Sequence, residues 1–177
     1  FMINTKRTAA AANLAQRAFG GEADRTGKPA LEHYRVVAQS FDDEDEACVA
    51  LLCDALNSGK VAEDDLRAVG LSDAALDACL VLRRGEAEEF FDYIIRIKDN
   101  GLAARVKRAD LVQHVADMES YISLTGYDRR RRTSYLKAID LIDGVDELAY
   151  DGLFESQHHH GQLKTSIPVA PKPPAQR

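Results

Sequence analysis

The chain has 177 residues, of which 45% are hydrophobic and 29% charged, an ordinary composition for a single soluble globular domain. The net charge is −6, and all the acidic residues precede Ser156. An acidic body argues against binding to extended nucleic acid, which requires a basic face. No apolar run approaches the ~20 residues that a membrane-spanning helix needs, so we expect no membrane association.

The N-terminal pattern and the cysteine content both favour the cytoplasm. The first residues lack the charged stretch and apolar run of a signal peptide. The three cysteines, Cys48, Cys53 and Cys79, form no CxxC pair. An odd number of thiols without a secretion signal is typical of reduced cysteines in a cytosolic protein, so we expect a cytoplasmic location.

Proline positions and the hydrophobic pattern predict an all-α fold. No proline separates Pro29 from Pro168, and valine and isoleucine do not alternate as they do in strands. Gly20 and Gly21 are expected to end the first helix, and Ser72 is expected to cap a later one. The expected helices cover about residues 6–19, 30–37, 43–56, 62–69, 73–82, 86–98, 102–122 and 129–148.

The domain organisation is expected to be simple. We predict one helical domain over residues 1–154 and a flexible, proline-rich tail over residues 155–177, where four prolines oppose regular helix. The tail histidines, residues 158–160, could bind adventitious Zn²⁺ or Ni²⁺. Of the five histidines, only His33 and His114 therefore belong to the expected domain.

Five segments of this domain resemble motifs of HD-domain metal-dependent phosphohydrolases of the type that hydrolyses guanosine tetraphosphate (ppGpp) in the stringent response. Their order and spacing agree from about Ala11 to Ala116, although each segment alone would be a weak signal. The segments are GKPALEH (27–33, like SGxPYxxHP), VALLCDAL (49–56, like ALLHDVxED), AEDDLRAVG (62–70, like TxEDLxxxG), FDYIIRIKDN (91–100, like YxDYIxRIKxN) and VKRADLVQH (106–114, like VKLADLxxN). The resemblance implies an HD-domain helical bundle.

The resemblance also implies, by position, four ligands for a divalent metal ion: His33, Cys53, Asp54 and Asp110. The family has a histidine where this chain has Cys53, and the other three keep the family's residue type. Two carboxylates and an imidazole suit Mn²⁺ or Fe²⁺, whereas a thiolate favours Zn²⁺. Other roles stay open: His33 could be a core or surface histidine, Cys53 a small core residue, and the two aspartates could be helix caps or partners of arginines.

The residues that assist hydrolysis in the family are replaced here. Asn57 and Ser58 stand in place of its acidic pair, and neither side chain can act as a carboxylate base. On one helix they would share faces with Cys53 and Asp54, four residues earlier. His114 replaces the usual asparagine and could be either a hydrogen-bonded residue of the pocket or a substitute ligand. We therefore assign no catalytic residue.

Basic residues beside these motifs are the candidates for binding a nucleotide phosphate, together with His114: Arg25, Lys28, Lys107 and Arg108. The successive arginines at 129–132 circle their helix, so at most one or two could reach a pocket. Two functions follow. The protein is expected to be either a nucleotide phosphohydrolase of impaired activity, with Mn²⁺, Fe²⁺ or Zn²⁺ bound weakly or not at all, or an inactive relative that binds a nucleotide or a protein partner.

Overall fold

The computed structural model describes residues 4–24 and 26–145, and every regular element in this part of the chain is a helix. This confirms the predicted all-α fold. The elements are α1 (Lys6–Phe19), α2 (Ala30–Gln39), α3 (Glu44–Leu52), the 3₁₀-helix η1 (Leu56–Ser58), α4 (Glu63–Ala68), α5 (Asp73–Val81), α6 (Phe90–Ile97), α7 (Gly101–Glu119) and α8 (Gly126–Asp143). None of these helices is long and apolar enough to cross a membrane. The expected tail, residues 155–177, lies outside the described residues.

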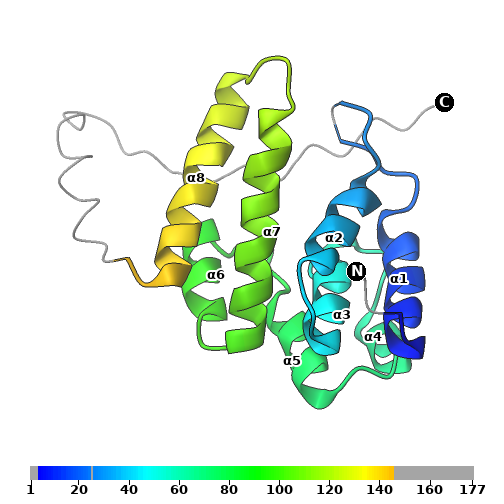
Figure 1. Ribbon diagram of the computed structural model, residues 1–177. Helices are drawn as coiled ribbons and strands as arrows, with labels where there is room; N and C mark the ends of the chain where they lie inside the picture. Colours follow the sequence, from blue (N-terminus) through cyan, green and yellow to red (C-terminus); the bar gives the residue numbers. More distant parts are fainter. Residues whose placement is uncertain (1–3, 25, 146–177) are drawn as a thin grey trace.

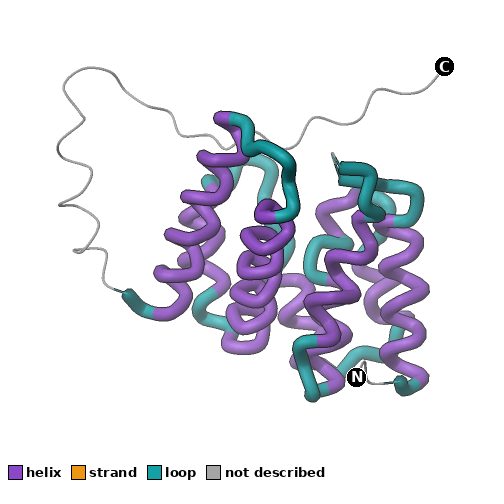
Figure 2. The backbone as a smooth tube through the Cα atoms, turned by 45° about the horizontal axis from the view of Figure 1, so that its top comes forward, coloured by secondary structure: helices purple, strands orange, loops and turns teal. Residues whose placement is uncertain are grey.

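The helices form two groups that lie side by side (Figure 1). One group holds α1 to α5 and the other α6 to α8, and α7 joins them by packing against α2, α3 and α5. Figure 2 shows the same division from another direction. Within the first group α3 packs against α1, α2 and α5, and its residues from Ala47 to Leu52 are at most 1% exposed. A helix that is apolar all round, as this stretch is, belongs in the core.

The central helix α3 ends earlier than predicted, at Leu52. The next residues turn through hydrogen bonds between residues three apart, such as the one from the Ala55 amide to the Leu52 carbonyl oxygen at 2.9 Å, and enter η1. The Ser58 hydroxyl then donates to the Ala55 carbonyl oxygen at 2.6 Å. The prediction of one continuous helix over residues 43–56 was wrong, and residues 53–58 do not share α-helical faces.

The later helices also begin and end at residues other than those predicted, and local hydrogen bonds explain two of these differences. α6 begins at Phe90 rather than at residue 86, because the Arg84 guanidinium closes a loop by donating to the Glu88 carbonyl oxygen at 2.7 and 2.9 Å. α7 stops short of the predicted residue 122. α8 begins before the predicted residue 129, because Thr125 and Asp128 cap it reciprocally, and it ends before the predicted residue 148.

Leu51→Ala tests the central place of α3. Leu51 is fully buried, so removing its side chain should leave a cavity and lower the free energy of unfolding by about 2–5 kcal/mol. Leu136→Ala is the matched control, because Leu136 on α8 is 38% exposed and should lose about 1 kcal/mol or less. Urea unfolding followed by circular dichroism measures both changes. Equal losses would contradict the core position of α3.

Candidate functional site

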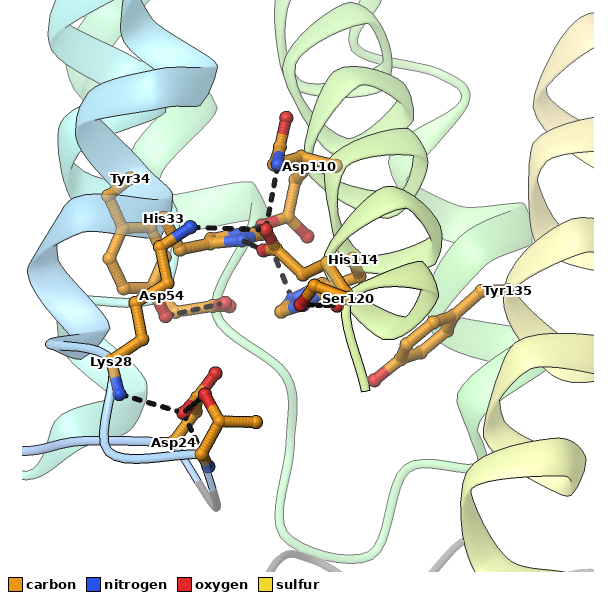
Figure 3. A network of polar contacts seen from close by, with 12 residues as sticks. Asp24, Lys28, His33, Tyr34, Asp54, Asp110, His114, Ser120 and Tyr135 are labelled. Atoms are coloured by element: carbon orange, nitrogen blue, oxygen red, sulfur yellow. Dashed lines mark hydrogen bonds and ion pairs between the residues drawn. The ribbon is translucent and has the colours of Figure 1, made fainter. Parts of the chain in front are cut away.

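Four polar side chains follow one face of α7 and form the centre of the candidate site. Lys107, Asp110, His114 and Asp117 recur every three or four residues, a spacing that places them on one side of a helix. α7 packs against α2 and α3 here, and α2 contributes His33. Figure 3 shows His33, Asp110 and His114 pointing toward one another between α2 and α7.

Asp110 lies at the middle of this cluster, and its side chain is fully buried. Its Oδ2 atom accepts a hydrogen bond from the Lys107 ammonium at 2.8 Å. Its Oδ1 atom lies 3.0 Å from His33 Nε2, 3.6 Å from His114 Nε2 and 3.8 Å from Cys53 Sγ. Among the described residues, no buried side-chain nitrogen or oxygen is left without a hydrogen-bond partner. The cluster is therefore satisfied by its own side chains.

The charges of Asp110 and Lys107 stabilise each other. Burial by itself would raise the pKa of Asp110, but the Lys107 ammonium and the two imidazoles outweigh burial and hold this pKa well below its usual value. Burial by itself would lower the pKa of Lys107, but Asp110 and Asp54 raise it well above its usual value. Both groups are therefore ionised at neutral pH.

The two histidines of the cluster have different protonation behaviour. Burial tends to lower the pKa of His33, but Asp110 and Asp117 raise it above its usual value. Burial lowers the pKa of His114 to about 4, although Asp110 acts in the opposite direction. At neutral pH the His114 ring is therefore uncharged and keeps a lone pair on one nitrogen.

Cys53 and Asp54 lie in the turn after α3, next to Lys107. The Lys107 ammonium is 3.7 Å from Asp54 Oδ1, and the Tyr34 hydroxyl donates to Asp54 Oδ2 at 3.3 Å. Burial, reinforced by the charges of Asp54 and Asp110, raises the pKa of the Cys53 thiol well above its usual value. The Cys53 thiol is therefore protonated at neutral pH.

Asp117 was not predicted from the sequence. Its Oδ2 atom lies 2.7 Å from His33 Nδ1, and its Oδ1 atom accepts a hydrogen bond from Gln113 at 2.9 Å and lies 3.5 Å from the Lys28 ammonium. The signal was present, because Asp117 follows Asp110 by seven residues and His114 by three and therefore shares their face of α7. No motif of the resemblance includes this position.

A series of stacked rings extends the cluster from His33 to Tyr135 of α8. The His33 and His114 rings stack at 4.0 Å between centroids, and the His114 ring in turn stacks on Tyr135 of α8 at 5.3 Å. Arg131 donates to the Tyr135 hydroxyl, at 3.0 Å from its Nε atom. Within the arginine run at 129–132, Arg131 thus contacts Tyr135, the last ring of this stack.

The structure brings most of the predicted site residues together. The cluster consists of six of them: His33, Cys53, Asp54, Lys107, Asp110 and His114. Lys28 lies at its edge, where its ammonium contacts Asp117. Asn57 donates to Asp54 Oδ1 at 3.4 Å, whereas Ser58 is bonded to the backbone of Ala55. Arg108 does not join them: it is exposed and forms an ion pair with Asp143 of α8, 2.6 Å from Nε to Oδ1. Arg25 lies outside the described residues.

The four residues implied as metal ligands do not fit a hard divalent ion well. The donor atoms of Cys53, Asp54 and Asp110 lie within 4.8 Å of one another, so the spacing alone would allow an ion. The Lys107 ammonium, however, already contacts both carboxylates. An ion bound to the same oxygens would lie about 4 Å from this charge, at a repulsion of roughly several kcal/mol.

Comparisons with known proteins bear on the fold. No family model and no curated protein matches the sequence. The structure is similar to the solved structure of a metazoan ortholog of SpoT that hydrolyses ppGpp and plays a role in starvation responses. The TM-score is 0.65 at 16% sequence identity, and the match covers 88% of this chain and 98% of that chain. The chain has an HD-domain-like fold. The predicted HD-domain architecture is thereby confirmed.

Lys107→Met tests whether the ion pair supports the fold. Methionine keeps the apolar length of the side chain but leaves the buried Asp110 carboxylate without its cation, which should lower the free energy of unfolding by about 3–5 kcal/mol. The adjacent Arg108→Met is the control, because its exposed ion pair with Asp143 should contribute about 1 kcal/mol or less. Chemical denaturation compares them.

A double variant separates loss of charge pairing from loss of packing. Lys107→Met combined with Asp110→Asn removes both charges, so it should be less destabilised than Lys107→Met alone. If the double variant were as unstable as the sum of its two single variants, Lys107 and Asp110 would not be energetically coupled.

Proposed function

We propose that the protein binds a phosphorylated nucleotide of the ppGpp class beside the Asp110 cluster, and that its metal-dependent hydrolysis of such a nucleotide is impaired. The nucleotide class is supported by the HD-domain-like fold, by the five collinear motif segments, and by the ppGpp hydrolysis of the solved relative. Lys28, with 37% of its side chain exposed at the edge of the cluster, supplies a cation that a phosphate could reach.

The observation that carries the impaired activity is the contact of Lys107 with Asp110 and Asp54. In the family these two aspartate positions hold a divalent ion, whose chemistry is to polarise a phosphoryl oxygen and activate a water molecule. In this chain their charge is compensated by a lysine side chain at 2.8 and 3.7 Å. A lysine ammonium carries half the charge of such an ion and has no open coordination position for water.

The replaced acidic pair supports the same conclusion. Asn57 lies beside Asp54 and uses its amide to donate to that carboxylate, so it can neither accept a proton nor activate water as a base. Ser58 is turned to the backbone carbonyl of Ala55. The position at which a general base would act is therefore filled by neutral, hydrogen-bonded side chains.

Binding of ppGpp is the first test. Isothermal titration of the full chain should show saturable binding, and Lys28→Ala should weaken it by roughly tenfold, the worth of one charge-assisted hydrogen bond. Arg108→Ala is the matched control, because Arg108 is turned to Asp143 and should leave the affinity unchanged. Equal weakening by both variants would indicate non-specific attraction, and no binding to the native chain would reject the proposed ligand class.

Repair of the site is the second test. Cys53→His with Asn57→Glu restores an imidazole beside Asp110 and a carboxylate beside Asp54. We expect tighter Mn²⁺ binding than in the native chain and measurable release of phosphate or pyrophosphate from ppGpp. Cys53→Ser with Asn57→Gln is the control, since it changes both positions without adding either group. Turnover by the native chain at the rate of the repaired variant would contradict impairment.

A further inference from the structure

Two apolar side chains lie on the outer side of α6, where the described residues leave them partly uncovered. Ile95 is 49% exposed. Phe91, four residues earlier and therefore on the same side of the helix, is half-buried, and the Lys137 ammonium of α8 lies 5.0 Å from its ring centroid. We call Phe91 and Ile95 the α6 face. Single exposed apolar residues are ordinary on a protein surface, so the surroundings of this face decide its meaning.

The α6 face lies where the chain leaves α8. α6 and α8 pack against each other (Figure 1), and each is joined to α7 by a short connection, so both run antiparallel to α7 and in the same direction. The Phe90 and Tyr135 rings are 6.1 Å apart between centroids, and from there both helices continue for about two turns, to Ile97 and Asp143. The chain therefore passes from α8 into Val145, which is 46% exposed, beside the α6 face.

The sequence that follows α8 has an amphipathic pattern. Residues 146–155 lie outside the described residues, so only their order is used here. Acidic residues occupy positions 146, 147, 151 and 155, whereas beyond residue 155 the chain has no acid and four prolines. Between the acids, apolar or small residues recur at the three- and four-residue spacing of one helical face: Val145, Leu148, Ala149, Gly152 and Leu153.

We propose that residues 146–155 fold back on the chain as a helix and cover the α6 face. Leu148 follows the end of α8 closely and would pack on Ile95, near the end of α6. Leu153 would pack on Phe91, because five residues of one helix span about the same length as the four residues that separate Phe91 from Ile95. The pairing buries the exposed isoleucine and the apolar side of the segment together.

Charge on α8 suits the acidic side of this segment. Arg130 and Lys137 are seven residues apart and therefore share a side of α8, and the contact of Lys137 with Phe91 places that side next to the α6 face. Arg130 is exposed and forms no ion pair with another described residue. The acids at positions 146, 147 and 151 would lie near these cations.

A second copy of the chain fits the α6 face less well. Two partly exposed side chains offer far less than the roughly 800 Å² per partner that a stable dimer buries. A segment tethered at Val145, beside the face, needs much less area, because a short tether gives it an effective concentration on the order of mM. The small size of the α6 face therefore favours the chain's own segment.

The segment would also support one wall of the candidate site without contacting a ligand. It would hold α6 against α8, and α8 carries the Tyr135 ring that stacks on His114. The inference does not depend on the proposed ppGpp binding, because its test measures thermal stability and oligomeric state in the absence of nucleotide.

Thermal unfolding of full-length variants tests the contact. Ile95→Ala and Leu148→Ala should each lower the Tm by about 2–4 °C, because each removes apolar surface that the segment buries. Their combination should lower the Tm by less than the sum, since both remove the same contact. The matched controls are Val112→Ala, at a 43% exposed position of α7, and Leu163→Ala, beyond the segment; neither should lower the Tm.

The opposite results are equally clear. On an uncovered helix surface alanine forms helix better than isoleucine, so an unchanged or raised Tm for Ile95→Ala overturns the proposal. Leu148→Ala with the same Tm as Leu163→Ala overturns it as well, and so does strict additivity in the double variant. Light scattering of the native chain completes the test, because a dimer with a concentration-dependent Tm would assign the α6 face to a second copy instead.

Discussion

A fully buried carboxylate has to be compensated, and the arrangement around Asp110 follows from that requirement. Lys107, three residues earlier on α7, supplies the opposite charge, and His33 supplies a hydrogen bond from α2. The His33 contact joins α2 to α7, and Lys107 also contacts Asp54 in the turn after α3. The polar cluster is therefore part of what fixes α2, α3 and α7 relative to one another, as well as a candidate site.

Because Lys107 pairs with Asp110, a shared fold need not mean shared chemistry in this chain. The HD-domain-like bundle brings His33, Cys53, Asp54 and Asp110 together, and no buried side-chain nitrogen or oxygen of the described residues lacks a hydrogen-bond partner. Cys53 supplies only a thiol here, and Asn57 and Ser58 add no carboxylate. Lys107 contacts the carboxylates of Asp54 and Asp110. A likeness of fold by itself does not establish turnover.

The chain also has polar residues that the implied metal site does not use. His114 and Asp117 are additional donors on the face of α7, and His33 contacts the Asp110 and Asp117 carboxylates through its two nitrogens. His33 therefore acts as a bridge that joins α2 to two carboxylates of α7.

The sequence by itself determined the helical class and predicted that His33, Cys53, Asp54 and Asp110 meet. The absence of proline between Pro29 and Pro168 and the apolar stretch in α3 are local properties, and helical spacing fixes which residues of α7 share a face. The collinear motifs placed His33 and Asp54 beside Asp110 although they are distant along the chain. Such information lies in residue order and can be read without coordinates.

Only the tertiary structure decided which side chains pair with one another. The end of α3 at Leu52 depends on a 3₁₀ turn stabilised by side-chain and backbone hydrogen bonds, which the apolar pattern does not reveal. Lys107 and Arg108 are neighbours in sequence, but successive residues on a helix point about 100° apart, so one enters the cluster and the other pairs with Asp143. Which carboxylate compensates which cation depends on distances across helices, and these exist only after α2, α3 and α7 have packed together.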